Sequence, residues 1–397
     1  MAELRIYILL AMLIGAAVTA IVIPLIIGFC RKFGYFDQPS QRKVHHTAVP
    51  RLGGLAFLPA MAMGSVISLL AYFSNTFSTP DFHFTAALMI VGATIVYLLG
   101  LVDDLLDLPA NLKFVILAVG SAILPVCNLQ IDNLYGLFGI GELPLWVAYP
   151  LTVLVIMTIV NAINLIDGID GLASGIAAIC LVVFTYLFWD LRTATFMSLS
   201  AALLGSVLAF FCFNVFGRFG GYKIFMGDAG SLILGYVLSY LAIKYMMMTE
   251  QDIYTNLNPL LLPYSVFIVP VYDLVRVAVT RVLDGQPMFQ ADNRHIHHVL
   301  MRCGLTMHQT LVVILLLVVL LIVGNLWLWK YHGDLAAPDR ALSTWAYIRD
   351  NLVDRDNGEW FWGVNADGTP DKDSPKAGFW KCPYHNTRMC LQVLDLI

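Results

Sequence analysis

The sequence predicts an all-α, polytopic integral membrane protein: a helical bundle of about ten transmembrane helices with a small extramembrane C-terminal tail. Of its 397 residues, 59% are hydrophobic and only 13% are charged. Apolar runs of about 20 residues, the length that crosses a bilayer, recur along the chain. Most of the chain is therefore expected to lie in a membrane.

The apolar runs divide the chain into ten expected spans. They cover residues 5–29, 53–73, 84–102, 113–130, 144–164, 170–189, 195–216, 231–248, 259–280 and 310–329. The first span is longer than the apolar region of a signal peptide and lacks a clear cleavage site, so we expect it to be retained. The spans form one membrane domain, residues 1–329, followed by the charged tail, residues 330–397.

Lysine and arginine residues fall almost entirely on one side of these expected spans. The loop after the first span is rich in them, the next loop carries none, and the loops on the second side hold only Arg192. Basic residues are retained in cytoplasmic loops. The first loop and every second loop after it are therefore predicted to be cytoplasmic.

Four polar motifs fall on this cytoplasmic side. DDLLD (103–107) ends the third span, NAINLIDGIDGL (161–172) ends the fifth, FMGDAGS (225–231) precedes the eighth, and DNRHIHH (292–298) lies between the ninth and tenth. Three carboxylates within five residues of DDLLD crowd like charges beside a low-dielectric medium, so they require a positive partner. The convergence of the motifs on one face predicts a functional site there.

Each motif also has a purely structural interpretation. Asp and Asn at helix ends are common caps, and the glycines of NLIDGIDG suit chain reversals. For a single motif this interpretation is about as good as the functional one. Asn161, Asn164, Asp167 and Asp170, however, follow one another at one-turn spacing in or beside a span, where unpaired polar groups are costly. Capping does not require four such groups.

The charged residues near the ninth span divide into two groups. Asp273 and Arg276, at positions i and i+3, favour a structural ion pair over a catalytic role by about two to one. The histidines of HIHH, beside Arg294 and Arg281, fit an anion-binding cluster at least as well as a metal site. The hard carboxylate oxygens suit Mg²⁺, with Mn²⁺ as an alternative.

Aspartates, a divalent cation and a basic cluster at one membrane face together indicate phosphoryl transfer. Two other classes of membrane protein share some of these features. A membrane prenyltransferase also uses aspartate-rich motifs with Mg²⁺, but it does not account for FMGDAGS or HIHH. A cation transporter would gather Asp, Asn and His near the bilayer midplane on broken helices, whereas these motifs lie mostly at one face.

Six ordered motifs give the chain a family resemblance over residues 1–329: GYFDQP (34–39), PRLGG (50–54) and the four above. The set resembles the polyprenyl-phosphate N-acetylhexosamine-1-phosphate transferases, which are related to the phospho-MurNAc-pentapeptide translocases. Ile296 interrupts the histidine run typical of the translocases. The resemblance therefore favours the undecaprenyl-phosphate GlcNAc-1-phosphate transferase branch, which initiates surface polysaccharides such as O-antigen.

The resemblance implies a reaction, its partners and a location. A Mg²⁺-dependent enzyme of the bacterial inner membrane would transfer a sugar 1-phosphate from a UDP-N-acetylhexosamine to a polyprenyl phosphate and release UMP at the cytoplasmic face. No nucleic-acid partner is expected, and a homodimer is compatible with the sequence.

The motifs and the resemblance together give the candidate site residues. Candidate catalytic residues are Asp103, Asp104, Asp107, Asp167 and Asp170. Candidate metal ligands are Asp228, Asp104 and Asp167. Candidate substrate-binding residues are Lys43, Asn161, Asn164, Arg281, Arg294, His295, His297 and His298.

The tail differs from the rest of the chain. It resembles the C-terminal end of N-acylglucosamine 2-epimerase-like proteins, including the region around His385 and Arg388. A full α/α barrel needs several hundred residues, so the tail alone cannot form that domain. By parity the tail lies outside the cytoplasm, which is the wrong side for a fragment of a normally cytosolic family. Either the tail is a fusion remnant without activity, or the span count is off by one.

Overall fold

A computed structural model describes residues 2–37, 48–76, 84–250, 261–286 and 294–332, together with 350, 365 and 369–372. The chain divides into two compact units, Met1–Trp329 and Lys330–Ile397. The epimerase-like region around His385 and Arg388 lies outside the described residues, and so does Lys43.

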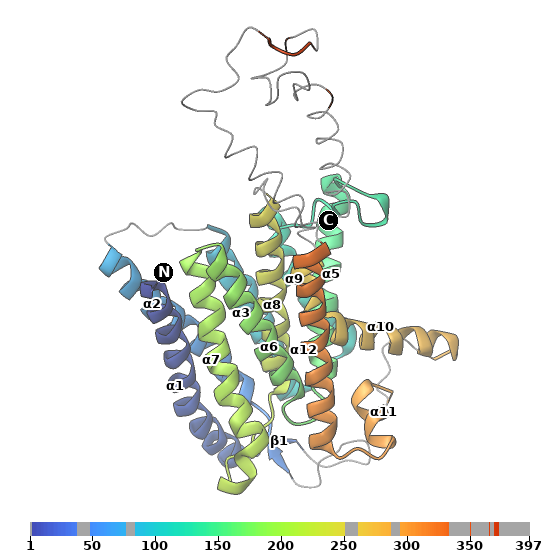
Figure 1. Ribbon diagram of the computed structural model, residues 1–397. Helices are drawn as coiled ribbons and strands as arrows, with labels where there is room; N and C mark the ends of the chain where they lie inside the picture. The colour runs from blue at the N-terminus through green and yellow to red at the C-terminus, as the bar shows by residue number, and fades with distance from the viewer. Residues whose placement is uncertain are drawn as a thin grey trace. The chain divides into compact units, whose positions relative to one another are not determined.

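The first unit is a bundle of apolar helices (Figure 1). Within the described residues, eight helices are long and apolar enough to cross a membrane. They are α1 (Ala2–Phe33), α2 (Phe57–Thr76), α3 (Phe84–Leu106), α5 (Leu145–Ile166), α6 (Leu172–Asp190), α7 (Ala194–Phe216), α8 (Gly227–Glu250) and α12 (Met307–His332). A further apolar helix, α4 (Ala110–Val126), is shorter, at 17 residues. The predicted polytopic helical membrane architecture is confirmed.

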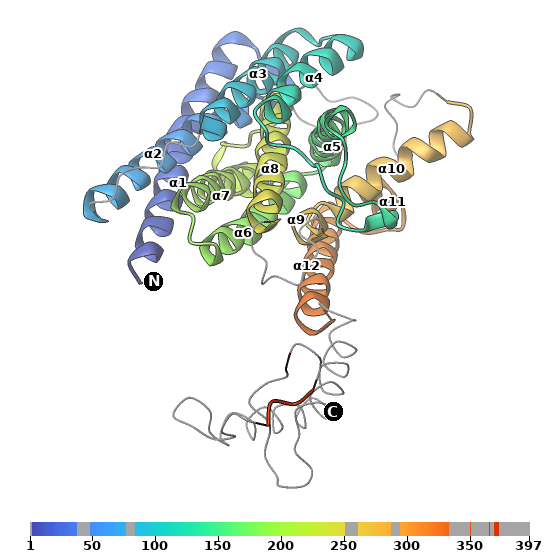
Figure 2. The same ribbon diagram turned by 90° about the horizontal axis from the view of Figure 1, so that it is seen from above.

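Helix α8 lies at the centre of the bundle, as the view from above shows (Figure 2). In its most apolar stretch 83% of the residues are buried, against 22% in α1. An all-round apolar helix is expected in such an enclosed position. It packs against α3 and α5, so the ends of these helices lie beside its first turn.

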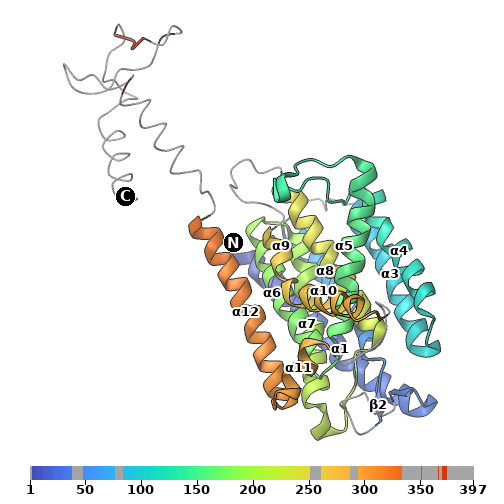
Figure 3. The ribbon, with the colours of Figure 1, turned by 90° about the vertical axis from the view of Figure 1, so that its right-hand side faces the viewer.

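The count of ten spans is not confirmed, because the expected span 259–280 is divided. The described part of this region forms a short α9 (Leu261–Ser265) and then α10 (Ile268–Leu283), which runs crosswise to the bundle (Figures 1 and 3). The buried face of α10 includes Asp273 and Arg281, whereas Tyr272 and Val279 are exposed. This two-faced pattern suits a helix with its charged side against protein and its apolar side against lipid.

Most of the short elements that the structure describes lie at the end of the bundle where α8 begins, and the one between α4 and α5 lies at the other end. Strand β1 (Phe36–Asp37) pairs antiparallel with β2 (Val49–Pro50), and Phe36 lies opposite Pro50. The remaining short elements are η1 (Gly53–Ala56), η2 (Leu137–Gly139), η3 (Gly217–Gly220) and α11 (Ile296–Arg302). The β1–β2 pair directs the chain from α1 toward the start of α8.

Candidate active site

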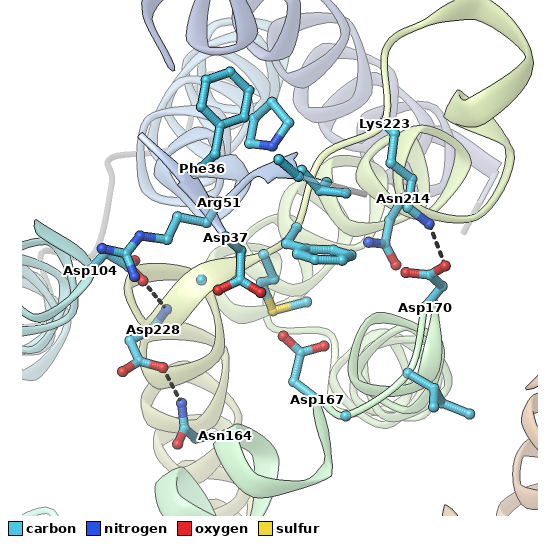
Figure 4. Close-up of a pocket in the computed structure, with 18 of the residues that line it drawn as sticks. Phe36, Asp37, Arg51, Asp104, Asn164, Asp167, Asp170, Asn214, Lys223 and Asp228 are labelled. Atoms are coloured by element: carbon cyan, nitrogen blue, oxygen red, sulfur yellow. Dashed lines mark hydrogen bonds and ion pairs between the residues drawn. The ribbon is translucent and has the colours of Figure 1, made fainter. Parts of the chain in front are cut away.

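A pocket of about 770 Å³ opens at the end of the bundle where α8 begins (Figure 4). Its walls come from the ends of α1, α3, α5 and α7 and from the start of α8. The charged residues in these walls are Asp37, Asp103, Asp104, Asp107, Asp167, Asp170, Asp228, Arg31, Arg51 and Lys223. Among the residues that the structure describes, seven aspartates stand against three basic residues, so this part of the pocket is acidic.

The PRLGG and FMGDAGS motifs form one wall by pairing their backbones. Phe225 N–H donates to Pro50 O at 2.8 Å, and Gly54 N–H donates to Met226 O at 2.7 Å. A Cβ on Gly54 would lie only 2.1 Å from the Gly230 Cα, so this position accepts no side chain without a shift of the backbone. The close pairing fixes the start of α8 against residues 50–54.

Asp104 holds the first turn of α8. Its Oδ1 accepts the N–H of Asp228 at 2.9 Å, and its Oδ2 accepts the N–H of Ala229 at 3.0 Å. The first N–H groups of a helix have no partner within the helix, and a negative charge there is favourable. Gly227, with φ +74°, provides the close approach, since a Cβ there would lie 2.6 Å from Asp104 Oδ2. The Asp104 carboxylate thus positions Asp228.

Asp228 points into the pocket from that first turn. Asn164, near the end of α5, donates its Nδ2 to Asp228 Oδ1 at 2.8 Å and also to Ser231 Oγ at 2.8 Å. The structure therefore brings together two residues predicted from separate motifs. Their oxygen atoms, with those of Asp167 across the pocket, are the hard donors that Mg²⁺ prefers.

Asp103 is paired with a residue that the motifs did not predict as part of the site. Lys113, in the first turn of α4, forms an ion pair with the buried Asp103 carboxylate, and its Nζ lies 3.8 Å from Asp228 Oδ2. Asp103 Oδ1 also accepts the N–H of Leu108 at 2.8 Å. The positive partner that the crowded DDLLD carboxylates require is thus supplied in part by Lys113.

The other predicted aspartates lie at the pocket in different environments. Asp170 forms an ion pair with Lys223. Asp107, at φ 50°, is 86% exposed, and its Oδ1 lies 3.7 Å from the Arg51 guanidinium. Asp167 follows the last residue of α5, and burial, together with the charges of Asp170 and Asp104, raises its pKa to about 7. A carboxyl group in this situation is stabilised as an anion by a nearby cation.

The opposite wall depends on a further residue that sequence reasoning did not identify. Asn214, near the end of α7, accepts the N–H of Gly171 at 2.6 Å and donates to Ile224 O at 2.9 Å. This one amide joins the IDGID turn to the chain that leads into α8. Asn161, by contrast, donates to Met157 O of its own helix and is not among the pocket-lining residues.

The three histidines have three different environments. His298 lines the pocket. His297 is 1% exposed, and neither of its ring nitrogens has a hydrogen-bond partner among the described residues. Burial, with His298 and His295 nearby, lowers the pKa of His297 to about 3, so this ring is neutral at pH 7. His295 is buried beside α10 instead.

Asp273 binds the start of α11. Its Oδ2 lies 2.8 Å from His295 Nδ1, and its Oδ1 accepts from Arg276 Nη2 at 2.7 Å and from Ile296 N–H at 3.0 Å. The predicted Asp273–Arg276 pair is present, and it belongs to this larger network. The network holds the short helix that carries His298.

The two predicted arginines of this region do not reach the pocket. Arg294 pairs with Asp284, and Arg281 is 5% exposed within α10. Neither is among the pocket-lining residues. The described lysines and arginines at the pocket are instead Arg31, Arg51 and Lys223, none of which was predicted as a site residue. The position of Arg51 inside PRLGG was the available signal.

Comparison with known proteins agrees with this arrangement. Residues 86–246 match the model of glycosyl transferase family 4. The chain is 35% identical over 317 residues to a probable undecaprenyl-phosphate N-acetylglucosaminyl 1-phosphate transferase of Bacillus subtilis (strain 168), covering 79% of this chain and 83% of that protein. It is 29% identical to the undecaprenyl-phosphate alpha-N-acetylglucosaminyl 1-phosphate transferase of Escherichia coli (strain K12), covering 73% of this chain and 76% of that protein. With its motifs gathered at one pocket and this degree of identity, the chain belongs to glycosyl transferase family 4, together with these undecaprenyl-phosphate N-acetylglucosaminyl 1-phosphate transferases.

Proposed function

We propose that the protein transfers an N-acetylhexosamine 1-phosphate from a UDP-sugar to undecaprenyl phosphate, giving a polyprenyl-diphosphate-linked sugar and UMP. The observation that carries this proposal is the convergence of PRLGG, DDLLD, IDGID and FMGDAGS on one acidic pocket at the end of a membrane bundle. Such a pocket is open to a water-soluble donor and lies beside the lipid that holds the acceptor. The names of the relatives support the choice of undecaprenyl phosphate.

The residues at the pocket fit the Mg²⁺ that such a transfer needs. Among the described residues no three His, Cys, Asp or Glu side chains form a ready-made metal site. Mg²⁺ usually keeps several waters and binds through one or two carboxylates plus substrate phosphates, so a preformed cage is not required. Asp228 and Asp167 would hold the ion, and Asn164 orients Asp228. When bound, Mg²⁺ supplies charge neutralisation for the phosphates.

The chemistry requires one bond to form and one to break. An oxygen of the lipid phosphate attacks the β-phosphorus of the UDP-sugar, and the bond from that phosphorus to the oxygen bridging to the α-phosphate breaks, releasing UMP. A phosphate monoester has a second pKa near 6 and is mostly dianionic at pH 7, so it needs little help from a base. Asp103, already paired with Lys113, then orients groups rather than accepting a proton.

We place the pocket at the cytoplasmic face of a bacterial inner membrane, where UDP-sugars occur. The distribution of basic loop residues supports this side. Cys303, exposed just after α11, gives a test. In a variant with Cys303 as its single cysteine, an impermeant thiol reagent should label only permeabilised cells. Labelling of intact cells would contradict the orientation.

The activity test uses the purified full chain with undecaprenyl phosphate, Mg²⁺ and a panel that includes UDP-GlcNAc and UDP-GalNAc. We expect UMP release with at least one donor, and none without the lipid or with excess EDTA. Asp228→Asn should abolish turnover, because it removes the charge that the metal requires. Asp190→Asn is the matched control, since Asp190 is exposed at the opposite end of α6.

Two results would count against the proposal. Failure of folded protein to release UMP with every donor would refute the function. An enzyme that accumulates a covalently bound sugar phosphate with donor alone, as UMP is released, would favour a two-step route through an aspartyl–phosphate–sugar intermediate over direct attack.

A further inference from the structure

Arg51 is held rigidly at the edge of the pocket. It lies between β2 and η1. The backbone hydrogen-bonds to residues 225–226 both before Arg51, at Pro50, and after it, at Gly53 and Gly54. Its own carbonyl oxygen is so close to α8 that a Cβ on Gly227 would lie 2.3 Å from it. The side chain lines the pocket, is 24% exposed and extends toward Asp104 (Figure 4). The backbone contacts therefore fix the position from which the Arg51 side chain enters the pocket.

The other basic residues that the structure describes around the pocket already have partners. Arg31 donates to Gly221 O at 2.7 Å, Lys223 pairs with Asp170, and Lys113 pairs with Asp103. These groups neutralise or brace the walls of the pocket. The two lysines are neutralised by aspartates, and Arg31 is held by a backbone carbonyl oxygen.

Arg51 differs from them. Its guanidinium forms no hydrogen bond with any residue that the structure describes, and its buried Nε has no partner there. Among the described residues the nearest carboxylate is that of Asp107: its Oδ1 lies 3.7 Å away, on a side chain that is 86% exposed. A buried N–H donor without a partner is costly, so a group that satisfies it would be bound favourably.

The charges in the pocket indicate which chemical group would bind to the Arg51 guanidinium. Seven aspartates would repel a phosphate, and a permanent cation among them lowers that barrier. Arginine stays protonated and presents a planar fork that matches phosphate oxygens in a bidentate way. We propose that Arg51 forms a phosphate-binding subsite, taking a phosphate group of one of the two substrates.

This inference rests on the proposed function, which supplies two sources of the same chemistry: the lipid phosphate and the diphosphate of the nucleotide sugar. Kinetics with each substrate varied separately distinguishes them. Arg51→Gln should raise KM at least about ten-fold for the substrate whose phosphate it binds, and change KM for the other less than three-fold. Arg51→Lys keeps the charge but loses the fork, so its KM should lie between those of Arg51→Gln and the wild type.

A matched control removes a different arginine. Arg302→Gln deletes an exposed guanidinium at the end of α11 and should leave both KM values within two-fold of the wild type. Thermal stability in detergent is measured for all variants. Both KM values and kcat within two-fold of the wild type in Arg51→Gln would overturn the subsite. So would a loss of activity that only follows a loss of thermal stability and is not partly restored in Arg51→Lys.

Direct binding separates failure of the subsite from failure of the proposed function. The melting temperature of the wild type and of Arg51→Gln is measured with UDP and Mg²⁺, and separately with undecaprenyl phosphate. A stabilisation present in the wild type and lost in Arg51→Gln supports the subsite even if no donor is turned over. Equal stabilisation of both proteins overturns the subsite alone. No stabilisation of the wild type by either ligand, with no turnover, overturns both.

Discussion

Replacing Asp104 with Asn tests whether this carboxylate positions α8 or binds the metal. Asp104 is 6% exposed, and its two oxygens accept two backbone N–H groups. Asn offers one oxygen, so one N–H is left facing an NH₂ group, which costs about 1–3 kcal/mol. The lost negative charge at the helix N-terminus adds roughly 0.3–1 kcal/mol. We expect Asp104→Asn to lower the free energy of unfolding by roughly 1–4 kcal/mol.

The assay is thermal unfolding of the full chain in detergent with EDTA and without substrate, so that metal binding cannot contribute. Asp104→Asn should lower the melting temperature by several degrees. The Mg²⁺ concentration that gives half-maximal turnover should stay unchanged in the protein that remains folded. Asp228→Asn is the comparison: its side chain accepts one Asn164 N–H, which an Asn oxygen can still accept, so its melting temperature should change little.

The opposite pattern would refute this reasoning. If Asp104→Asn melted like the wild type in EDTA but needed far more Mg²⁺ for turnover, Asp104 would be a metal ligand and its two backbone bonds would be unimportant for stability.

Three further changes probe other parts of the site. Gly54→Ala places a Cβ 2.1 Å from a backbone atom of α8, so this variant should give no monodisperse peak in size-exclusion chromatography. The control Gly141→Ala, whose Cβ would have no atom within 4 Å, should elute like the wild type, and a monodisperse Gly54→Ala would contradict the close packing. Asp273→Asn removes the charge from a carboxylate that holds three donors, and should lower stability by about 2–3 kcal/mol while the folded fraction keeps measurable turnover. Normal stability with abolished turnover would instead indicate a direct role in the reaction. The pKa of His297 in the folded protein lies below its unfolded value of about 6.5. As the pH falls from 7 to 5, the unfolded chain therefore gains a proton on this ring and the folded protein does not. The free energy of unfolding should fall by up to about 2 kcal/mol over this range. His297→Gln should reduce the dependence of the melting temperature on pH, and identical slopes in the two proteins would count against the buried neutral ring.

The helices that cross the bundle could be predicted because their signal is local. A run of apolar residues long enough to span a bilayer needs no knowledge of its neighbours, and α6 and α7 begin and end within two residues of the expected spans. A single span over 259–280 is not confirmed, because mean apolarity takes no account of the helical period. Asp273 and Arg281 recur on one face of α10, which gives a helix with two different sides.

The sequence predicted which residues belong to the site better than it predicted the contacts between them. Asp228, Asn164, Asp167 and His298 do line one pocket, because four motifs lie at the same end of their helices. The pairing of Lys113 with Asp103 joins separate helices and depends on how α3 and α4 pack.

The sequence also does not show in which direction a side chain points from its helix. Asn161 and Asn164 lie one turn apart, yet Asn161 bonds back to its own helix. Asn164, by contrast, reaches Asp228 on another helix. Spacing alone cannot distinguish these two outcomes.

The pairing of residues 50–54 with residues 225–230 has a consequence for biogenesis. At translation rates of about 5–20 residues per second, the first segment leaves the ribosome roughly ten to thirty seconds before its partner exists. Throughout that interval the N–H groups of Gly53 and Gly54 lack their final acceptors at a membrane surface. A nascent chain stalled before residue 225 should therefore expose this segment to proteases, and completion of the start of α8 should be the step that protects it.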